Sequence, residues 1–309
     1  PSVSDIFFTW YMGGTLCVPL EEEVMTPYDF IRREKINYWN SVPSIVGFMK
    51  KMGYLSKGAF PSIEYSMFCG EQLPKHCADA WRIAAPNSTI ENLYGPTEAT
   101  IYTSRYLYSN SKEKELFCNN IIPIGQAFPT MTIEIINENL DRGNSGEIGE
   151  IVYKGPQVTQ GYLNDESKTK SVFVQFDWDK SGDIWYKSGD LGFLNKSGDF
   201  ECIGRKDNQI KLGGRRIEIG EIESVLSKFT LLQDVVVVAI KNDDQITTGC
   251  VAFTMNEISK EGKIRIRQES MQYLEQVFFP KKIVTIDEFP RSPSGKIDRK
   301  TLSLKAQNL

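Results

Sequence analysis

The chain is organised around one stretch, Asn92-Leu93-Tyr94-Gly95-Pro96-Thr97-Glu98-Ala99-Thr100. Its Gly-Pro pair bends the backbone. Just after the bend, the hydroxyl of Thr97 can bond a phosphate oxygen, and the carboxylate of Glu98 can hold a hard cation such as Mg²⁺. Tyr94 offers a flat ring face to a base, and Asn92 offers an amide that can read a base edge. By itself the stretch also fits a loop with a helix cap, so its meaning depends on the rest of the chain.

The composition is ordinary for a globular protein and sets broad limits on function. The 309 residues are 40% hydrophobic and 25% charged, enough for two or three packed units. A formal net charge of -4 gives no excess of positive charge to attract nucleic acid. No apolar run approaches the roughly 18 residues that span a bilayer, so we expect no membrane insertion.

The start of the chain lacks the basic and apolar regions of a signal peptide. It also lacks an initiator methionine, and we interpret the chain as part of a longer protein. Six cysteines are scattered without a C-x-x-C pair, which indicates reduced thiols in a cytoplasmic protein. His76 is the single histidine, so a histidine-based triad or metal site is not expected.

Residues 1–120 alternate apolar segments with turns. Strands are expected at 15–18, 63–69 and 88–93, and helices at 28–34, 43–52 and 74–83. This alternation predicts a mostly parallel α/β sheet. Ligands bind such sheets beyond the carboxyl ends of the strands, which is where Gly70-Glu71 and Tyr94-Gly95 lie.

Two further parts follow. Residues 121–206 contain short strands separated by Gly, Asn and Asp turns, which predicts a small antiparallel barrel or sheet. Residues 207–309 combine a helix from residue 219, a hairpin over 234–253, a second helix over 266–278 and a strand at 282–286. This last part is expected to be a compact α+β unit.

A second motif is Tyr186-Lys187-Ser188-Gly189-Asp190-Leu191-Gly192. An aspartate after a glycine turn can accept two hydrogen bonds from a ribose diol, although an isolated Asp190 would also fit an ordinary β-turn.

A third motif runs over 204–218. There Arg205 can bond ribose or phosphate, and Asp207 lies where a hinge could absorb backbone rotation. Gly213-Gly214 suggests a tight loop that another backbone or a thin ligand approaches closely. The alternative is a basic, solvated linker between domains.

A fourth motif, over 290–300, holds Lys296 within a Pro-Ser-Gly frame near the terminus. Its ammonium could meet a carboxylate or an α-phosphate as charge develops in a transition state. A plain basic tail is the alternative. The segments 146–151 and 155–162 form a fifth motif with a structural role.

Together these motifs resemble the amino-acid adenylation domains of the adenylate-forming (ANL) superfamily, which includes acyl-CoA synthetases and luciferases. The resemblance covers residues 1 to about 302. Pro96 and the segment 216–218 favour the amino-acid branch, and the segments 41–44 and 68–74 resemble D-alanine–carrier protein ligases. The fold implied is a partial large N-terminal domain, with a parallel α/β sheet and a small β-barrel, followed by a small mobile α+β C-terminal domain.

The resemblance implies ATP and Mg²⁺ as cofactors and assigns roles to particular residues. Adenine would lie against Tyr94, near Asn92 and the Gly70-Glu71 backbone; Thr97 would meet phosphate, Glu98 would hold Mg²⁺, Asp190 and Arg205 would hold ribose, and Lys296 would bridge the substrate carboxylate and the α-phosphate. The carboxylate would attack the α-phosphorus and release pyrophosphate. The last unit would then rotate about Asp207, and the Gly213-Gly214 loop would approach the phosphopantetheine thiol of a carrier protein.

The same resemblance gives a substrate pocket, lined by Pro1, Ser4, Asn40, Met67, Cys69, Leu93, Ile101 and Tyr102. Because no charged side chain is among them, a small or medium uncharged amino acid is expected. Cys69 favours D-alanine by resemblance. Leu93 and Ile101 also fit plain core positions.

Two features of the resembled family would lie upstream of Pro1: a phosphate loop rich in Ser, Thr, Gly and Lys, and an aspartate that anchors the substrate's amino group. We therefore expect poor catalysis by this chain alone. An acyl- or aryl-CoA synthetase is an alternative function, and a non-catalytic nucleotide-binding remnant is another. The presence of Glu98, Asp190, Arg205 and Lys296 favours a catalyst.

Overall fold

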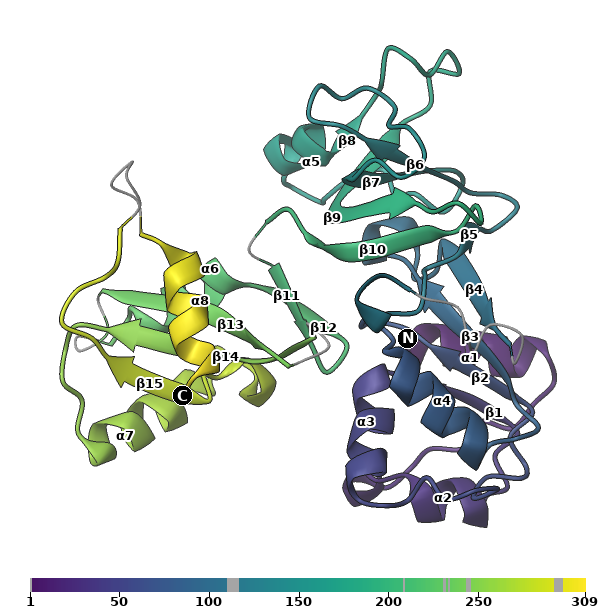
Figure 1. Cartoon of the computed structure of the whole chain (residues 1–309), viewed down its shortest axis with the longest axis horizontal. Coiled ribbons are helices and arrows are strands. Elements are labelled where there is room, and N and C mark those ends of the chain that lie inside the picture. Colours follow the sequence, from purple (N-terminus) through teal and green to yellow (C-terminus); the bar gives the residue numbers. More distant parts are fainter. Residues whose placement is uncertain are drawn as a thin grey trace. The chain divides into compact units, whose positions relative to one another are not determined.

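The structure is a computed structural model that describes residues 2–109, 117–207, 209–229, 232, 234–242, 246–291 and 297–309. The chain divides into two compact units, Pro1–Asp207 and Asn208–Leu309 (Figure 1). The first unit holds a mixed sheet with its helices and a second, antiparallel sheet, and the second unit is a small α+β fold. The expectation of a mixed α/β architecture is therefore confirmed.

The first sheet has five strands in the order β1-β2-β3-β4-β5. They are β1 (Tyr38–Ser41), β2 (Tyr65–Phe68), β3 (Thr89–Tyr94), β4 (Ser104–Tyr108) and β5 (Gln126–Ala127). The first three strands are parallel, and β4 and β5 run antiparallel to their neighbours. The carboxyl ends of β1, β2 and β3 consequently meet at one edge, where parallel sheets bind ligands.

Helices accompany these strands, and three of the α-helices contribute buried residues to the apolar core beside the sheet. Their bounds are α1 (Ser2–Tyr11), α2 (Tyr28–Arg33), α3 (Pro43–Lys51) and α4 (Lys75–Ala84), with the short 3-10 helices η1 (Glu21–Glu23), η2 (Thr97–Ala99) and η4 (Cys118–Asn120). In α4, Cys77, Ala78 and Trp81 recur at helical spacing and are buried. Trp81 donates its indole hydrogen to Ser66 Oγ at 2.8 Å and packs edge-on against Phe68. The helix is thereby fixed to strand β2.

Two local expectations for this region differ from the structure. Residues 15–18 form no strand, because the chain after Gly13-Gly14 runs without a ladder partner in the described residues. Strand β4 was not expected; it pairs antiparallel with β3 through residues such as Tyr106, opposite Asn92.

The second sheet follows in sequence and is antiparallel throughout. Its members are β6 (Thr132–Ile136), β7 (Gly149–Lys154), β8 (Phe173–Val174), β9 (Trp185–Leu194) and β10 (Phe200–Arg205), and α5 (Glu166–Val172) precedes β8. The order is β10-β9-β7-β6, with β8 paired to β9. Among the described residues this is an open sheet rather than a closed barrel, and β9 lies inside it.

The two sheets of the first unit are joined by direct bonds. Gly125 and Phe200 form an isolated antiparallel bridge, and the side-chain amide of Gln72 donates to the carbonyl of Cys202 at 3.0 Å. Asn92, on β3, donates to the carbonyls of Ile122 and Pro123 at 3.1 and 2.8 Å. These bonds hold the end of β3 next to β9 and β10.

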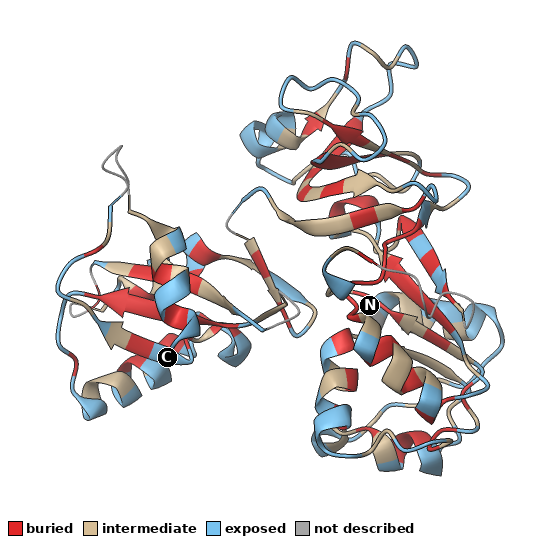
Figure 2. Cartoon of the chain, viewed as in Figure 1, coloured by how far each residue is buried: buried red, intermediate tan, exposed pale blue. Residues whose placement is uncertain are grey.

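The second unit has a three-stranded sheet in the order β13-β14-β15 and a two-stranded hairpin, β11-β12. The strands are β11 (Gln209–Leu212), β12 (Arg215–Glu218), β13 (Val235–Lys241), β14 (Thr247–Thr254) and β15 (Lys282–Thr285); the helices are α6 (Ile219–Leu226), α7 (Lys260–Ser270), α8 (Arg299–Gln307) and the 3-10 helix η6 (Gln276–Phe278). The buried residues in Figure 2 follow the strands of each unit.

The helix expected over 266–278 is wrong. Helix α7 ends at Ser270, and the chain turns before η6. Ile266, Leu274 and Phe278 are all buried in one apolar cluster. Their spacing therefore matches that of one helix face, although they belong to separate elements.

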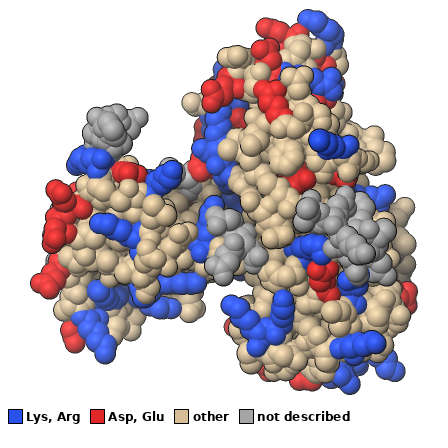
Figure 3. Space-filling model, in the orientation of Figure 1, with Lys and Arg blue, Asp and Glu red and all other residues tan. Residues whose placement is uncertain are grey.

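No helix among the described residues is both long and apolar enough to cross a membrane. Basic and acidic side chains are interspersed over the face shown in Figure 3. This distribution agrees with a net charge of only -4.

Candidate active site

A buried carboxylate lies where the two sheets of the first unit meet. Asp190, on β9, is 3% exposed. It stands directly opposite Arg205 in the β9–β10 register, and Arg205 Nη1 donates to Asp190 Oδ1 at 2.6 Å. The hydroxyl of Tyr94, at the end of β3, donates to Asp190 Oδ2. Three residues from three separate motifs are thereby brought together.

Arg205 also binds a second carboxylate. Its Nε and Nη2 donate to the two oxygens of Asp207 at 2.6 and 2.5 Å, a bidentate pair of the kind that fixes guanidinium geometry. Gly189 lies under this pair with φ +74°, and a Cβ there would stand 2.6 Å from Arg205 Nη2 and 2.9 Å from Asp207 Oδ2. Glycine is thus required both by the backbone and by the closeness of the guanidinium.

Tyr94 and Asn92 make different kinds of hydrogen bond at this edge of the sheet. Burial, and next the charge of Asp190, raise the pKa of the Tyr94 phenol, so the hydroxyl keeps its proton and donates. The two amide hydrogens of Asn92 hold the backbone at residues 122–123, and the side chain is 3% exposed. Because both amide hydrogens are engaged in this way, a contact between this amide and a base would be made through the amide oxygen.

Glu98 lies in η2, immediately beyond the same strand. It is 5% exposed, and the hydroxyl of Tyr162 donates to its Oε1 at 2.6 Å. Thr97, beside it, is exposed. Gly95 allows this turn, because a Cβ there would lie 2.6 Å from the carbonyl oxygen of Ile101.

The donor set at Glu98 fits Mg²⁺ better than a metal with nitrogen or sulfur ligands. No group of three His, Cys, Asp or Glu side chains that could hold a metal occurs among the described residues. Mg²⁺ commonly takes only one or two protein carboxylates and completes its shell with phosphate oxygens and water. One carboxylate beside an exposed Thr97 hydroxyl suits that arrangement.

A polar cluster lies at the ends of β1 and β2. Asn40 Nδ2 donates to Asp5 Oδ1 at 2.6 Å and to the Tyr102 hydroxyl at 3.0 Å. Ser4 Oγ lies 3.3 Å from the same hydroxyl. Cys69, which is 4% exposed, has its Sγ 3.6 Å from that hydroxyl and 3.9 Å from Asn40 Oδ1. Four of the expected pocket residues are thus joined in one network.

Asp5 was missed by the sequence reasoning, which expected no charged side chain in this set. It follows Ser4 on α1, and burial raises the pKa of its carboxyl above the ordinary value. Burial likewise raises the pKa of the Tyr102 phenol. No signal in the sequence marked Asp5, because its role arises from contact with Asn40, which lies on a strand distant in sequence.

Three other expected pocket residues lie on β2, on β3 and in the turn after η2. Met67, on β2, accepts from the Tyr38 hydroxyl through its Sδ at 3.0 Å. Leu93 is 4% exposed on β3, and Ile101 has φ +74° in the turn after η2. Pro1 lies outside the described residues.

Gly70 and Glu71 follow β2. Gly70 has φ +83°, and Glu71 Oε2 accepts from the backbone N–H of Ser44 at 3.0 Å. The carboxylate therefore ties this turn to the first residues of α3.

In the second unit, Gly213 and Gly214 are the two central residues of the β11–β12 hairpin, between the paired Leu212 and Arg215. Their φ values are +57° and +74°. Two-residue hairpin turns of type I′ need positive φ at both positions, so turn geometry alone explains the glycine pair. Lys296 lies outside the described residues.

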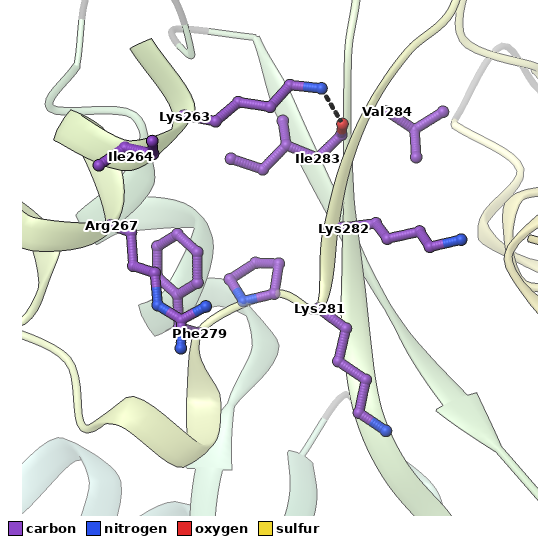
Figure 4. A pocket seen from close by; sticks show the side chains of 9 residues that line it. Lys263, Ile264, Arg267, Phe279, Lys281, Lys282, Ile283 and Val284 are labelled. Atoms are coloured by element: carbon purple, nitrogen blue, oxygen red, sulfur yellow. Dashed lines mark hydrogen bonds between the residues drawn. The ribbon is translucent and has the colours of Figure 1, made fainter. Parts of the chain in front are cut away.

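The second unit also carries a depression of about 390 Å³ between α7 and β15 (Figure 4). Its lining combines cationic side chains with apolar ones: Lys263, Ile264, Arg267, Phe279, Pro280, Lys281, Lys282, Ile283 and Val284. Arg267 stacks on Phe279, and Lys263 Nζ donates to the carbonyl of Ile283 at 3.0 Å. None of the expected site residues lines it.

Comparison with known proteins identifies the family. The profile of the AMP-binding enzyme family matches residues 2–163, more than half of the chain. The chain therefore belongs to this family, and the resemblance to adenylate-forming enzymes is confirmed.

Individual relatives show which members of the family this chain is similar to. The D-alanine–D-alanyl carrier protein ligase of Bacillus velezensis is 32% identical, over 97% of this chain and 60% of that protein. The adenylation domain AlmE of Vibrio cholerae, solved with glycyl-adenosine-5′-phosphate, is 31% identical with a TM-score of 0.87, covering 100% of this chain and 57% of that one. PA1221, a nonribosomal peptide synthetase (NRPS) protein with adenylation and peptidyl carrier protein (PCP) domains, shares the fold at 22% identity with a TM-score of 0.74, over 92% of this chain and 47% of that one. The chain thus spans about 60% of the length of the curated relatives it matches.

Proposed function

We propose that the protein containing this chain activates a small neutral amino acid as an aminoacyl-adenylate, using ATP and Mg²⁺. The aminoacyl group is then passed to the phosphopantetheine thiol of a carrier protein. One observation carries this proposal: the buried carboxylate of Asp190 is held by Arg205 and Tyr94 where the β3 strand end meets β9. The printed descriptions of the ligase and glycyl-adenylate relatives support the amino-acid branch.

In this proposal the nucleotide lies along the strand-end edge. Asp190 accepts hydrogen bonds from the ribose hydroxyls, with Arg205 beside it. The Tyr94 ring packs on the adenine, next to the turn at Gly70-Glu71 and to Asn92, which acts by shaping the edge. The tilted Tyr153 ring, with its centroid 6.2 Å from that of Tyr94, supports the Tyr94 ring from within the second sheet.

Phosphate chemistry falls to three residues. Glu98 holds Mg²⁺, oriented by the Tyr162 hydroxyl. Thr97 bonds a phosphate oxygen, and Lys296 bridges the substrate carboxylate and the α-phosphate. Mg²⁺ supplies charge neutralisation on the phosphates. The carboxylate of the amino acid attacks the α-phosphorus, and pyrophosphate leaves.

The amino acid occupies the cluster around Asn40, Cys69 and Tyr102, with Pro1, Ser4, Met67, Leu93 and Ile101 as its further lining.

We assign residues 1–120 and 121–206 to the nucleotide-binding core and 207–309 to a mobile domain that turns about Asp207 between the two half-reactions. The Gly213-Gly214 turn then approaches the thiol. None of the six cysteines forms a disulfide bond, which supports a reducing, cytoplasmic setting.

The test is amino-acid-dependent exchange of pyrophosphate into ATP by the full-length gene product. The panel contains glycine, both alanine enantiomers and larger neutral amino acids. Exchange driven by one small neutral amino acid is the expected result. Exchange with none, together with activity on a carboxylic acid that lacks an amino group, would instead indicate an acyl- or aryl-CoA synthetase.

A further inference from the structure

The carboxylate of Asp5 decides which way the Asn40 amide faces. A carboxylate oxygen can only accept a hydrogen bond, so the Asn40 group 2.6 Å from Asp5 Oδ1 must be the NH₂ end. The second hydrogen of that NH₂ goes to the Tyr102 hydroxyl at 3.0 Å. The Asn40 oxygen is consequently turned to the side of Cys69, whose Sγ lies 3.9 Å away.

We propose that Asp5 is a positioning residue for amino-acid selection, because it fixes the hydrogen-bond polarity of the Asn40–Tyr102–Cys69 cluster. This inference rests on the proposed function and adds a residue that none of the expected pocket positions includes. Asp5 acts through Asn40 and need not touch the substrate. The cluster then presents one fixed pattern of donors and acceptors.

The orientation of the Asn40 amide also determines the hydrogen bonding of the Tyr102 hydroxyl. The Tyr102 hydroxyl accepts from Asn40 and keeps its own hydrogen for donation, with Ser4 Oγ at 3.3 Å. Burial raises the pKa of Tyr102, which keeps that hydrogen in place. Without Asp5 the amide could turn over and exchange its donor and acceptor ends, and the cluster would lose its single pattern.

A purely structural role for Asp5 is separable from this one. Asp5 lies in the first turn of α1, where an acidic residue is favoured by the helix dipole. Asp29 also lies in the first turn of its helix, α2, and is exposed. Asp29→Ala therefore removes the same helix-end charge without touching the cluster and serves as the matched control.

The experiment measures the KM for the preferred amino acid, the KM for ATP and kcat in pyrophosphate exchange by the full-length protein. The variants are Asp5→Ala, Asp5→Asn, Asn40→Ala, the double variant of Asp5→Ala with Asn40→Ala, and Asp29→Ala. For Asp5→Ala we expect the amino-acid KM to rise about tenfold or more, as fits the loss of one charge-assisted hydrogen bond. The ATP KM should stay within about twofold, because the nucleotide edge is untouched.

The other variants separate positioning from stability. Asp5→Asn should lose less than Asp5→Ala, because its amide oxygen can still accept from Asn40. In the Asn40→Ala background, Asp5→Ala should have little further effect, because the group that Asp5 orients is already gone. Asp29→Ala should behave as the unaltered protein.

Each contrary result points to a different failure. An unchanged amino-acid KM in Asp5→Ala, or equal rises in both KM values, overturns the positioning role while the proposed function stands. Full additivity in the double variant overturns it as well. No exchange by the unaltered protein with any amino acid overturns the proposed function and this inference together. AMP binding by each variant shows that its core is folded.

Discussion

Arg205 and Asp190 face each other across the β9–β10 pair, with Nη1 and Oδ1 2.6 Å apart. Their side chains are only 12% and 5% exposed. In such surroundings an ion pair adds little compared with apolar packing, but breaking it is costly because one charge stays buried. The pair therefore connects the stability of the first unit to its proposed ribose site.

Arg205→Ala should lower the free energy of unfolding by about 3–5 kcal/mol, because the Asp190 carboxylate would lose its balancing charge. It should also weaken AMP binding. Urea unfolding and AMP titration by calorimetry measure the two effects. Lys170→Ala is the control, since that residue is 75% exposed in a surface pair with Glu166 and should change stability by less than about 0.5 kcal/mol. A loss in Arg205→Ala no larger than in the control would show that the pair is not effectively buried.

Gly189→Ala should be more harmful than Gly182→Ala. Both glycines have φ +74°, so both variants carry the backbone cost of about 1–2 kcal/mol. Only at Gly189 would the new Cβ meet the Arg205 guanidinium, at 2.6 Å, while nothing lies within 4 Å at Gly182. The extra fall in melting temperature and in AMP affinity isolates this contact. Equal losses in the two variants would mean that the guanidinium moves aside freely.

Glu98→Gln should raise the Mg²⁺ concentration for half-maximal pyrophosphate exchange by about tenfold or more, because the neutral amide is a poorer ligand for a hard cation. The Tyr162 hydroxyl can still donate to the Gln oxygen, so the fold should be kept. Glu64→Gln, at an exposed position, should leave the Mg²⁺ dependence unchanged. An unaltered dependence in Glu98→Gln would remove Glu98 from the metal site.

Lys296→Ala should slow adenylate formation by about 10²–10³-fold, by analogy with the loss of one transition-state donor. Transfer of the aminoacyl group from a preformed adenylate to the carrier thiol should suffer much less. Single-turnover assays of the two half-reactions test this, with Lys300→Ala as a neighbouring exposed control. Equal losses in both half-reactions would argue against the rotation about Asp207.

Asp179→Asn should remove part of the acid sensitivity of the first unit. Lys154, at 2.8 Å, is the main cause that holds the pKa of Asp179 well below its ordinary value, and the indole of Trp185 also donates to it. A depressed folded-state pKa gives stability that is present above about pH 4 and lost as the pH falls through that pKa. The variant should thus be less stable at pH 7, and the difference should shrink in acid.

Urea midpoints at pH 7 and at successive steps below pH 4 provide the measurement for Asp179→Asn. Asp177→Asn, in the same exposed loop, should show no such convergence. A constant difference across the whole pH range would assign the stabilisation to packing instead of charge.

The sequence predicted the regular helices and strands of the first sheet better than the places where helices end or the chain turns. The buried face of α4 and the alternating segments around β2 and β3 followed from residue spacing. The expected helix over 266–278 failed because Ile266, Leu274 and Phe278 reach one cluster from separate elements. Spacing along a chain records burial, and burial does not reveal whether the backbone between two residues is continuous helix.

The candidate site was predicted in a similarly uneven way. Motif spacing named Asp190 and Arg205, and the structure joins them. It gave no role to Asp5 and only a structural one to Tyr162, because the contacts of both side chains join segments distant in sequence. It also predicted a base contact for Asn92, but not that the two amide hydrogens hold residues 122–123, which leaves the amide oxygen for that contact.

The bond from Tyr94 to Asp190 runs between the first sheet and the second. A nucleotide that contacts both residues would bind only when the two sheets are docked, so its binding free energy would be added to their docking. Without nucleotide, the two sheets could then separate while each one stays folded. When the site is saturated with nucleotide, the separation of the sheets and their unfolding would take place in one step. Occupancy of the site would in this way set how cooperatively the first unit unfolds, and not only how stable it is.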